Sequence, residues 1–279
     1  MPPTPTQPPP PIHGARAMAE SFGTDPDRYD RARPPYPEAL VAAVAGVGPA
    51  GPARDVLDVG CGTGIAARQL RAAGCTVLGV EPDARMAAFA RERGVPVEVA
   101  TFETWEPAGR TFDAVVAAQS WHWVDPAVGA AKAASVLRPG GRLAVFGHVF
   151  EPPDDVAQAF ADVFRRVVPE SPFVGGSGRR PVEAYQAGYA AIADTVRATG
   201  LFEAPEHWRF DVEHTWTRDA WLELLPTTGG LTRLDADRLA EVLAAVGDAI
   251  DARGGSFTIP FTTLAVTARR RARDAAQLG

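Results

Sequence analysis

Cysteine is scarce in this sequence. The 279 residues include two, Cys61 and Cys75, and their spacing fits neither a disulfide framework nor a set of metal ligands. We therefore expect a reducing compartment and no bound metal. The sequence also lacks an apolar run of about eighteen residues and an apolar segment close to its start. Both absences argue against a membrane span and against secretion, so the predicted location is the cytoplasm.

Positive charge is not concentrated either. The formal net charge is -6, and no cluster of lysines and arginines precedes an apolar helix, so nucleic acid and membrane surfaces are not expected partners. The basic run Arg269–Arg273 lies at the end of the sequence and receives no function. With 46% apolar residues the chain can bury the core of a soluble domain. A small neutral or acidic molecule is the expected partner, and the oligomeric state is left open.

Prolines divide the first part of the chain. Seven of the first eleven residues are proline, which removes amide donors and fixes φ, so residues 1–20 are predicted to form a disordered leader. Residues 21–45 predict a short polar helix, a break at Pro34 and Pro35, and then an apolar helix.

Residues 55–149 alternate apolar runs with helical stretches. This pattern is typical of stacked βα units, whose strands form a buried parallel sheet. The predicted strands are Val56–Val59, Thr76–Val80, Val95–Val99, Ala114–Ala118 and Leu143–Val149. Gly74 and Gly94 can end the intervening helices in left-handed C-caps, and Asp83 can N-cap the second helix. The stretch "LRPGG" (Leu137–Gly141) predicts a turn into the fifth strand.

The pattern changes after Phe150. Amphipathic helices at Val156–Val168 and Tyr185–Thr199 flank the loop "FVGGSGRRP" and predict a helical lid insertion over residues 151–205. The elements expected in residues 206–279, which complete the sheet, are a strand at Phe210–Trp216, a helix at Asp235–Ala252 and a long strand at "SFTIPFTTLAVTARR". The predicted fold class is therefore α/β, a doubly wound and mostly parallel seven-stranded sheet with helices on both faces, an antiparallel C-terminal edge strand and a helical lid.

The stretch "DVLDVGCGTG" (Asp55–Gly64) places three glycines where the first strand ends and a helix begins. Bare backbone amides at a helix N-terminus, on the carboxyl edge of a parallel sheet, let a ligand approach the main chain closely. Glu81 ends the second strand, and Pro82 favours an extended backbone there. A carboxylate in this place can accept hydrogen bonds from both hydroxyls of a ribose. The sequence therefore predicts a nucleoside-containing cofactor.

A dinucleotide is the alternative cofactor. Gly62, Gly64 and Ala67 satisfy the loose G-x-G-x-x-A fingerprint of an NAD-type oxidoreductase, with Glu81 about 20 residues further on. Counted from Gly60, however, the turn is G-x-G-x-G, with Ile65 where the third small residue should fall. A second nucleotide-binding half is also not evident, so an extended diphosphate fits the chain poorly.

Several motifs together resemble one known family. They are "VLDVGCGTG" (Val56–Gly64), Glu81, "FDAVVAAQSWHWVD" (Phe112–Asp125) and "LRPGG". They resemble the Rossmann-like, class I S-adenosylmethionine-dependent methyltransferases, and most closely the type 11 branch that includes relatives of trans-aconitate methyltransferase. The likeness covers residues 21–150, an N-terminal lid segment with the cofactor-binding core. It implies S-adenosylmethionine as cofactor and a small or mid-sized organic acceptor. A non-catalytic protein that binds the same cofactor is a second alternative.

The resemblance implies a set of cofactor contacts. The three glycines of the loop would line the methionine part, Asp58 would order the loop, and Glu81 would hold the ribose. The segment "YDRARPPYP" (residues 29–37) would close over the methionine carboxylate. The residues given these roles, with further implied contacts, are Tyr29, Arg33, Tyr36, Asp58, Gly60, Cys61, Gly62, Gly64, Glu81, Pro82, Thr101, Phe102 and Gln119.

The adenine contact departs from the family pattern. The family often has an acid after the third strand for the adenine amine, and here Thr101 stands in its place. Thr101 or Glu103 could substitute for that acid. Phe102 is either a platform for the adenine ring or an ordinary core residue.

The candidate catalytic residue is His122, in "QSWHWVD" just beyond the fourth strand. The cofactor's methyl group should point there, and His122 could be a base, a substrate contact or a structural residue. Its neighbours Trp121 and Trp123 could stabilise the sulfonium or shape an apolar pocket, and His148 and Tyr185 complete the expected acceptor site. In-line methyl transfer relies on alignment and needs few reacting side chains. The residues do not rank oxygen, nitrogen and carbon acceptors, while the resemblance favours oxygen, including a carboxylate.

Overall fold

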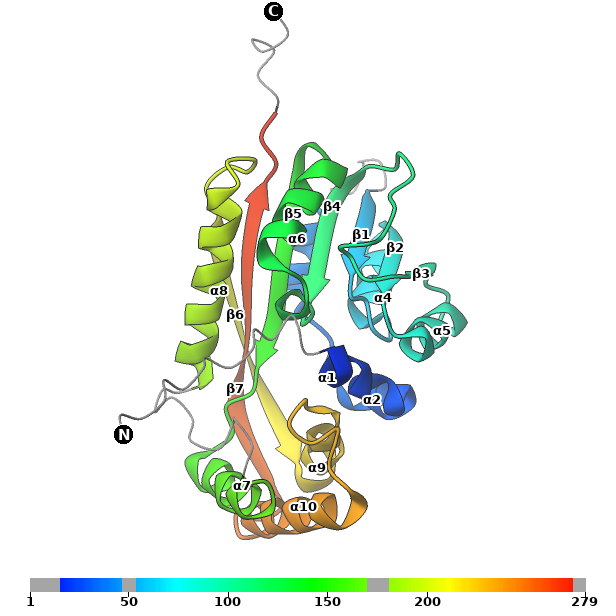
Figure 1. Cartoon of the computed structure of the whole chain (residues 1–279). Coiled ribbons are helices and arrows are strands. Elements are labelled where there is room, and N and C mark those ends of the chain that lie inside the picture. The colour runs from blue at the N-terminus through cyan, green and yellow to red at the C-terminus, as the bar shows by residue number, and fades with distance from the viewer. Residues whose placement is uncertain (1–15, 47–53, 170–180, 273–279) are drawn as a thin grey trace, which may run out of the picture.

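The computed structural model describes residues 16–46, 54–169 and 181–272. Within them, seven strands form one sheet in the order β3-β2-β1-β4-β5-β7-β6 (Figure 1). The strands are β1 (Asp55–Val59), β2 (Thr76–Glu81), β3 (Val97–Val99), β4 (Phe112–Ala118), β5 (Leu137–Val149), β6 (Glu206–Thr217) and β7 (Ser256–Arg269). β1 to β5 pair in parallel, and β7 is antiparallel to both β5 and β6. The predicted mixed sheet is confirmed, but β6 forms the edge and the C-terminal strand β7 lies inside it.

Helices cover both faces of the sheet. Residues of α3 (Glu38–Ala45), α4 (Ile65–Ala72) and α5 (Ala84–Glu92) share one core cluster with the strands. Residues of α6 (Pro126–Val136) and α8 (Pro181–Ala198) share the cluster on the other face. Because both faces are covered, the parallel strands are apolar on both sides, which explains their continuous hydrophobic runs.

The predicted helix ends agree with the structure, and the start of β5 does not. The Asp83 carboxylate accepts a hydrogen bond from Arg85 N as the N-cap of α5, and Gly74 and Gly94 have φ of 93° and 83°. β5 begins at Leu137, so "LRPGG" lies inside the strand. Gly140 has φ of 75°, and the pairing of β4 with β5 shifts register here, which is why this stretch looks like a turn in the sequence.

The long β6–β7 pair extends beyond the rest of the sheet. β5 ends where Val149 pairs with Thr262, whereas β6 and β7 remain paired as far as Thr217 and Ser256. This two-stranded extension has apolar side chains that the core helices do not reach. Residues of α7 (Asp154–Val167), α9 (Arg218–Leu224) and α10 (Ala236–Asp251) pack around it in a third core cluster. We call these three helices and the extension the cap (Figure 1).

The cap differs from the lid insertion predicted over residues 151–205. α7 belongs to it, but α8 lies along the sheet face against β7. The rest of the cap comes from α10, which was predicted as a helix of the region that completes the sheet, and from α9, which was not predicted. The loop "FVGGSGRRP" lies outside the described residues apart from its last residue. The register of β6 on β7 determines which helices pack on the two-stranded extension. That register depends on contacts between residues far apart in the sequence.

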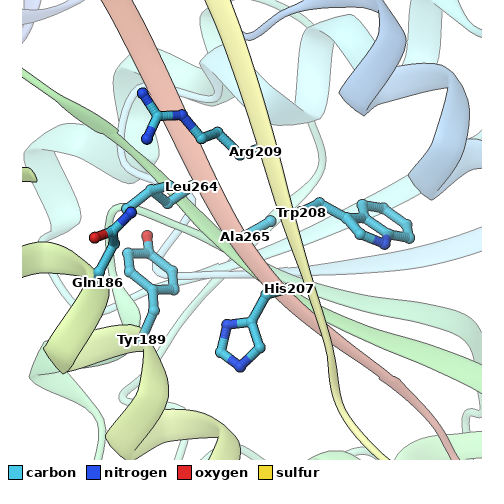
Figure 2. A pocket seen from close by; sticks show the side chains of 7 residues that line it. All are labelled: Gln186, Tyr189, His207, Trp208, Arg209, Leu264 and Ala265. Atoms are coloured by element: carbon cyan, nitrogen blue, oxygen red, sulfur yellow. The ribbon is translucent and has the colours of Figure 1, made fainter.

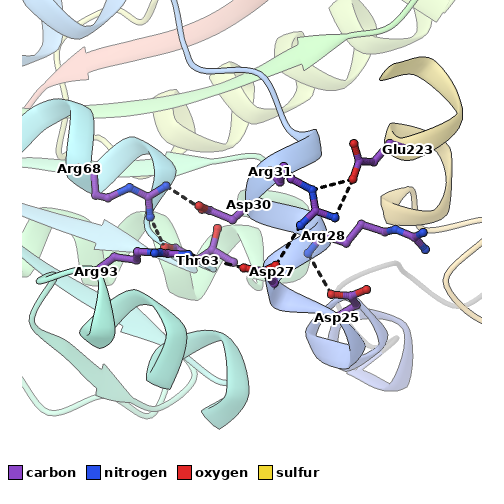
Figure 3. Close-up of polar contacts among 9 residues, drawn as sticks. All are labelled: Asp25, Asp27, Arg28, Asp30, Arg31, Thr63, Arg68, Arg93 and Glu223. Carbon is purple, nitrogen blue, oxygen red and sulfur yellow. Dashed lines mark hydrogen bonds and ion pairs between the residues drawn. The ribbon is translucent and has the colours of Figure 1, made fainter. Parts of the chain in front are cut away.

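The N-terminal helices connect the cap to the core. Helix α1 (Arg16–Ser21) contains the last five residues of the predicted disordered leader, so that prediction extends too far, and residues 1–15 lie outside the described chain. A 3-10 turn η2 (Phe22–Thr24) and helix α2 (Pro26–Ala32) follow. Figure 3 shows α2 linked to both neighbours, because Asp30 pairs with Arg68 of α4 at 2.7 Å and Arg31 pairs with Glu223 of α9 at 2.7 Å.

Candidate active site

The glycine loop follows β1 and holds three backbone conformations that favour glycine. Gly60, Gly62 and Gly64 have φ of 63°, 55° and 86°. A Cβ on Gly60 would lie 2.6 Å from the Ser120 Cβ, so this glycine lets the loop pack against the end of β4. A Cβ on Gly62 would meet no atom within 4 Å. The space beside Gly62 is therefore open to a ligand that approaches the main chain.

Glu81 ends β2 beside this loop. Its Oε2 accepts a hydrogen bond from Gly62 N at 2.8 Å, and its Oε1 accepts one from Asp83 N at 2.9 Å. Burial raises the pKa of Glu81 to about 7, although these two amides favour the charged form. Each carboxylate oxygen keeps a second lone pair, which a ribose hydroxyl can use. Glu81 therefore shapes the loop, and its contact with a ribose stays a prediction.

Asp58 is fully buried beneath the loop. Neither carboxylate oxygen makes a hydrogen bond of normal geometry among the described residues, although the backbone of Ala67 lies near enough to favour the charged form. Burial, followed by the nearby Glu81, raises the pKa of Asp58 to about 8. The group is therefore largely protonated at neutral pH in the folded chain.

On the adenine side of the expected site, most polar groups already make hydrogen bonds within the protein. The Thr101 hydroxyl lies 2.9 Å from that of Thr104, and Glu103 accepts a hydrogen bond from Asp125 N. Phe102 is 3% exposed in a cluster with Trp105 and Trp121, so the structure favours its core interpretation. Cys61 is also buried, and Pro82 is half-buried after Glu81. Thr101 is half-buried, and its partner Thr104 is exposed.

His148 and Tyr36 hold the lid segment to the sheet. The two rings stack 4.4 Å apart. His148 Nδ1 lies 2.9 Å from Thr263 Oγ1, and its Nε2 lies 3.3 Å from the Pro34 carbonyl oxygen. Burial lowers the pKa of His148 to about 3, so the ring is neutral. At 2% exposure and with both nitrogens engaged, His148 has no free ring nitrogen for an acceptor in this structure.

All four tyrosines of the chain gather around the end of β5. Tyr36 lies close enough to Tyr29 and Tyr189 for their charges to affect its pKa, and Tyr185 affects that of Tyr189 in the same way. A Cβ on Gly147 would lie 2.8 Å from the Tyr189 hydroxyl and 2.4 Å from Gln119 Oε1. Sequence reasoning omitted Tyr189 from the site because helical spacing alone does not say which face of α8 meets the sheet.

His122 and its neighbours occupy the 3-10 turn η3 (Trp121–Trp123) after β4. The His122 side chain is exposed, and the protein packed around the turn lowers its pKa to about 4. Trp123 is half-buried, with its ring 6.1 Å from Phe22 of the N-terminal segment. Trp121 is 3% exposed and packs in the core. The structure thus places His122 and Trp123, but not Trp121, where a ligand can reach them.

A surface pocket lies between α8 and the strands β6 and β7. Figure 2 shows Gln186 and Tyr189 of α8 facing it, opposite His207, Arg209 and Leu264. None of these residues comes from the glycine loop. A second pocket lies between the segment after α2 and helix α4. Within the described residues, no helix is long and apolar enough to cross a membrane, and no three His, Cys, Asp or Glu side chains gather as metal ligands do.

These features fit S-adenosylmethionine. The open space at Gly62 accepts a ligand against bare amides, Glu81 has lone pairs for two ribose hydroxyls, and Asp58 is a buried carboxyl group that makes no hydrogen bond of normal geometry with the described residues. The strand order with β7 antiparallel between β5 and β6, together with this loop, defines a class I methyltransferase fold.

Comparisons with known proteins agree with this class. The methyltransferase domain family matches residues 57–145. A demethylmenaquinone methyltransferase of a Mycobacterium species is 31% identical over 193 residues, which cover 67% of this chain and 76% of that protein. The chain therefore belongs to the class I S-adenosylmethionine-dependent methyltransferases, and its cofactor is S-adenosylmethionine. This assignment disfavours the dinucleotide alternative.

Two further similarities locate the chain within this family. An uncharacterized methyltransferase of Mycobacterium tuberculosis is 42% identical over 131 residues, 46% of this chain and 52% of that protein, so the chain spans about half the length of this curated relative. A solved structure from Anaeromyxobacter dehalogenans, provisionally described as a type II methyltransferase, is 27% identical. It superposes with a TM-score of 0.54 over 85% of this chain and 96% of its own. The trans-aconitate branch is not among these similarities.

Replacement of Glu81 should weaken cofactor binding. In Glu81→Ala, we expect the affinity for S-adenosylhomocysteine to fall about tenfold to a hundredfold, because hydrogen bonds to a charged group contribute about 1.5–3 kcal/mol. The free energy of unfolding should fall too, because Gly62 N and Asp83 N lose their acceptor. Calorimetric titration and denaturant unfolding measure the two effects. Glu92→Ala, at an exposed position of α5, is the control. Unchanged affinity in Glu81→Ala would place the ribose contact elsewhere.

Proposed function

We propose that this protein transfers the methyl group of S-adenosylmethionine to an oxygen of a small or mid-sized organic acceptor, and that this oxygen is already ionised, as in a carboxylate. The cofactor supplies an electrophilic methyl group on a sulfonium. Gly60, Gly62, Gly64 and Glu81 would hold it against the ends of β1 and β2. His122 and Trp123 would contact the acceptor beyond β4.

One observation carries the choice of an ionised oxygen. The histidines at η3 and in β5 both have pKa values below the ordinary one, which makes them weaker bases than a free imidazole. The surrounding protein lowers the pKa of His122, whose side chain is nevertheless exposed, and His148 is enclosed, with both ring nitrogens engaged and its pKa lowered to about 3. Burial raises the pKa of Tyr36, Tyr185 and Tyr189, so their hydroxyls keep their protons. An acceptor that must lose a proton would find little help here.

The charge balance of the reaction also suits this site. The bond from the cofactor sulfur to the methyl carbon breaks as the bond from that carbon to the acceptor oxygen forms, and a cation and an anion become two neutral products. Aromatic side chains surround this region, and partial exclusion of water favours the loss of opposite charges. The tyrosines and Trp123 would align the acceptor, because alignment supplies most of the catalysis in an in-line displacement.

Turnover with matched acceptors tests this proposal. The purified chain is incubated with S-adenosylmethionine and a series of aromatic and aliphatic carboxylic acids, each beside the corresponding alcohol, and S-adenosylhomocysteine is measured. We expect turnover of acids, with kcat independent of pH between about 6 and 9 because the carboxylate stays ionised. His122→Gln should retain kcat within severalfold and raise the KM for the acid, since a lost substrate contact weakens ground-state binding.

Other outcomes would contradict the proposal in distinct ways. Turnover of alcohols alone, with kcat that rises with pH and collapses in His122→Gln, would make His122 a general base. Binding of S-adenosylhomocysteine without turnover of any acceptor would favour the non-catalytic alternative.

A further inference from the structure

Arg33 is a half-buried cation at the end of α2. It precedes Pro34, which favours extended backbone, and its φ and ψ of -80° and 127° end the helix. Its guanidinium carbon lies 4.9 Å from the centre of the Tyr29 ring and 5.9 Å from that of Phe150. The Arg33 Nε donates a hydrogen bond to Thr227 Oγ1 at 2.9 Å. The guanidinium plane is therefore held between aromatic rings and the cap.

The chain around Arg33 is fastened on both sides. Asp30, one turn earlier, is tied to Arg68 of the core, and Arg31 is tied to Glu223 of the cap (Figure 3). On the other side, the Pro34 carbonyl oxygen lies 3.3 Å from His148 Nε2 of β5. These contacts on both sides fix the backbone position of Arg33. A pre-positioned fork of donors loses little entropy when it binds a planar anion.

Arg33 has no carboxylate partner among the residues that the structure describes. By contrast, Arg31, two residues away, pairs with Asp27 and Glu223. A guanidinium withdrawn from water without a counter-charge is unfavourable, and an anionic ligand would compensate it. Two of the five donors bond to Thr227, which leaves donors for a carboxylate.

The contacts of Arg33 lie near the end of β5 and near α8, which is where we place the acceptor. Phe150 directly follows β5, Thr227 belongs to the β6–β7 connection, and the charge of Arg33 lowers the pKa of Tyr185 on α8, against the larger effect of burial. None of the contacts described for the guanidinium is with residues 60–64, where the methionine part of the cofactor would lie. Arg33 also lines a surface pocket with Ile65 and Arg68 of α4, the helix that follows the loop, so its expected place at the methionine carboxylate stays a prediction.

We propose that Arg33 is the anion anchor of the acceptor site, and that it selects acceptors carrying a carboxylate. This inference rests on the proposed function only in naming the bound molecule as the acceptor. The rings of Tyr29 and Phe150 hold the guanidinium, and Thr227 accepts two of its donors and leaves the others for a carboxylate. The acceptor would accordingly be an organic acid with an apolar body that packs on these rings.

Binding measurements test the anchor without turnover. The probes are phenylacetate, 3-phenylpropionate and 4-phenylbutyrate, each beside its neutral primary amide, titrated into the full chain with and without S-adenosylhomocysteine. We expect the wild-type chain to bind at least one acid about tenfold or more tightly than its amide. Arg33→Gln should remove this preference and leave the affinity for S-adenosylhomocysteine within about twofold. Arg33→Lys should restore part of the preference, because it keeps the charge but loses the fork.

Arg197→Gln is the matched control, because Arg197 lies exposed on α8 and pairs only with Asp194 among the described residues. This variant should change neither the affinity for S-adenosylhomocysteine nor the preference for acids over amides. Loss of S-adenosylhomocysteine binding in Arg33→Gln, with the acid preference intact, would return Arg33 to the methionine carboxylate and overturn the anchor. Equal binding, or no binding, of every acid and amide by the wild type would also overturn it. A wild type that prefers acids through Arg33 but binds no S-adenosylhomocysteine would instead contradict the proposed function and leave the anchor standing.

Discussion

Gly62→Val should nearly abolish cofactor binding while the protein stays folded. The Cβ built on Gly62 meets no protein atom within 4 Å, so a valine side chain has room in the cofactor-free chain. The same space is where a ligand would approach the backbone of the loop. We expect the affinity for S-adenosylhomocysteine to fall about a hundredfold or more, equivalent to ~2.7 kcal/mol, measured by calorimetric titration.

Strain at a positive φ must be separated from loss of the binding space. Gly62 has φ of 55°, so valine there should also lower the free energy of unfolding by about 1–3 kcal/mol. Gly74→Val is the matched control, because Gly74 has φ of 93° with no atom within 4 Å of its Cβ and lies just past the end of α4 that is opposite the glycine loop. It should lose comparable stability and keep its cofactor affinity. Equal loss of affinity in both variants would contradict a ligand space at Gly62.

The part of the fold that could be predicted from the sequence is the part with local signals. β1 and β2 are short runs rich in valine and leucine, Asp83 caps its helix within three residues, and Gly74 and Gly94 end theirs in the left-handed region. The glycine loop was predicted for the same reason, because its three positive φ values arise within five residues. Each of these features depends on neighbours in the sequence.

The cap could not be predicted because it depends on distant pairings. The register that leaves Ser256 to Phe261 of β7 paired only with β6 is set by contacts between residues 39 to 49 positions apart. The role of His148 depends on Thr263 and Pro34, over a hundred positions away on each side. A sequence pattern shows that such a histidine lies in a strand, but not which groups will enclose it.

Stability of the cofactor-free protein should fall as pH rises from about 6.5 to 8, and Asp58 should be a main cause. Its pKa is raised to about 8 by burial, whereas in the unfolded chain it returns to its ordinary value near 3.8. Between these values the folded state binds a proton that the unfolded state has lost. The contribution is therefore fully present below the unfolded pKa and is lost as pH rises through the folded pKa, with a slope of up to about 1.4 kcal/mol per pH unit.

Asp58→Asn removes this titration while it keeps the shape of the side chain. Denaturant unfolding at pH 6.5 and pH 8 should show the variant gaining about 1.5 kcal/mol relative to the wild type over that interval. The pKa of Glu81 is raised to about 7, so its titration also lowers stability as pH rises. This effect falls in the lower part of the pH interval and is common to the wild type and the variant. Asp113→Asn is the control, because Arg138 holds the pKa of Asp113 below its ordinary value and the group is ionised in both states across this range. Asp113→Asn should lower stability by the same amount at both pH values. A parallel pH dependence in Asp58→Asn and the wild type would mean that Asp58 is ionised in the folded chain, with a hydrogen-bonding partner beneath the glycine loop.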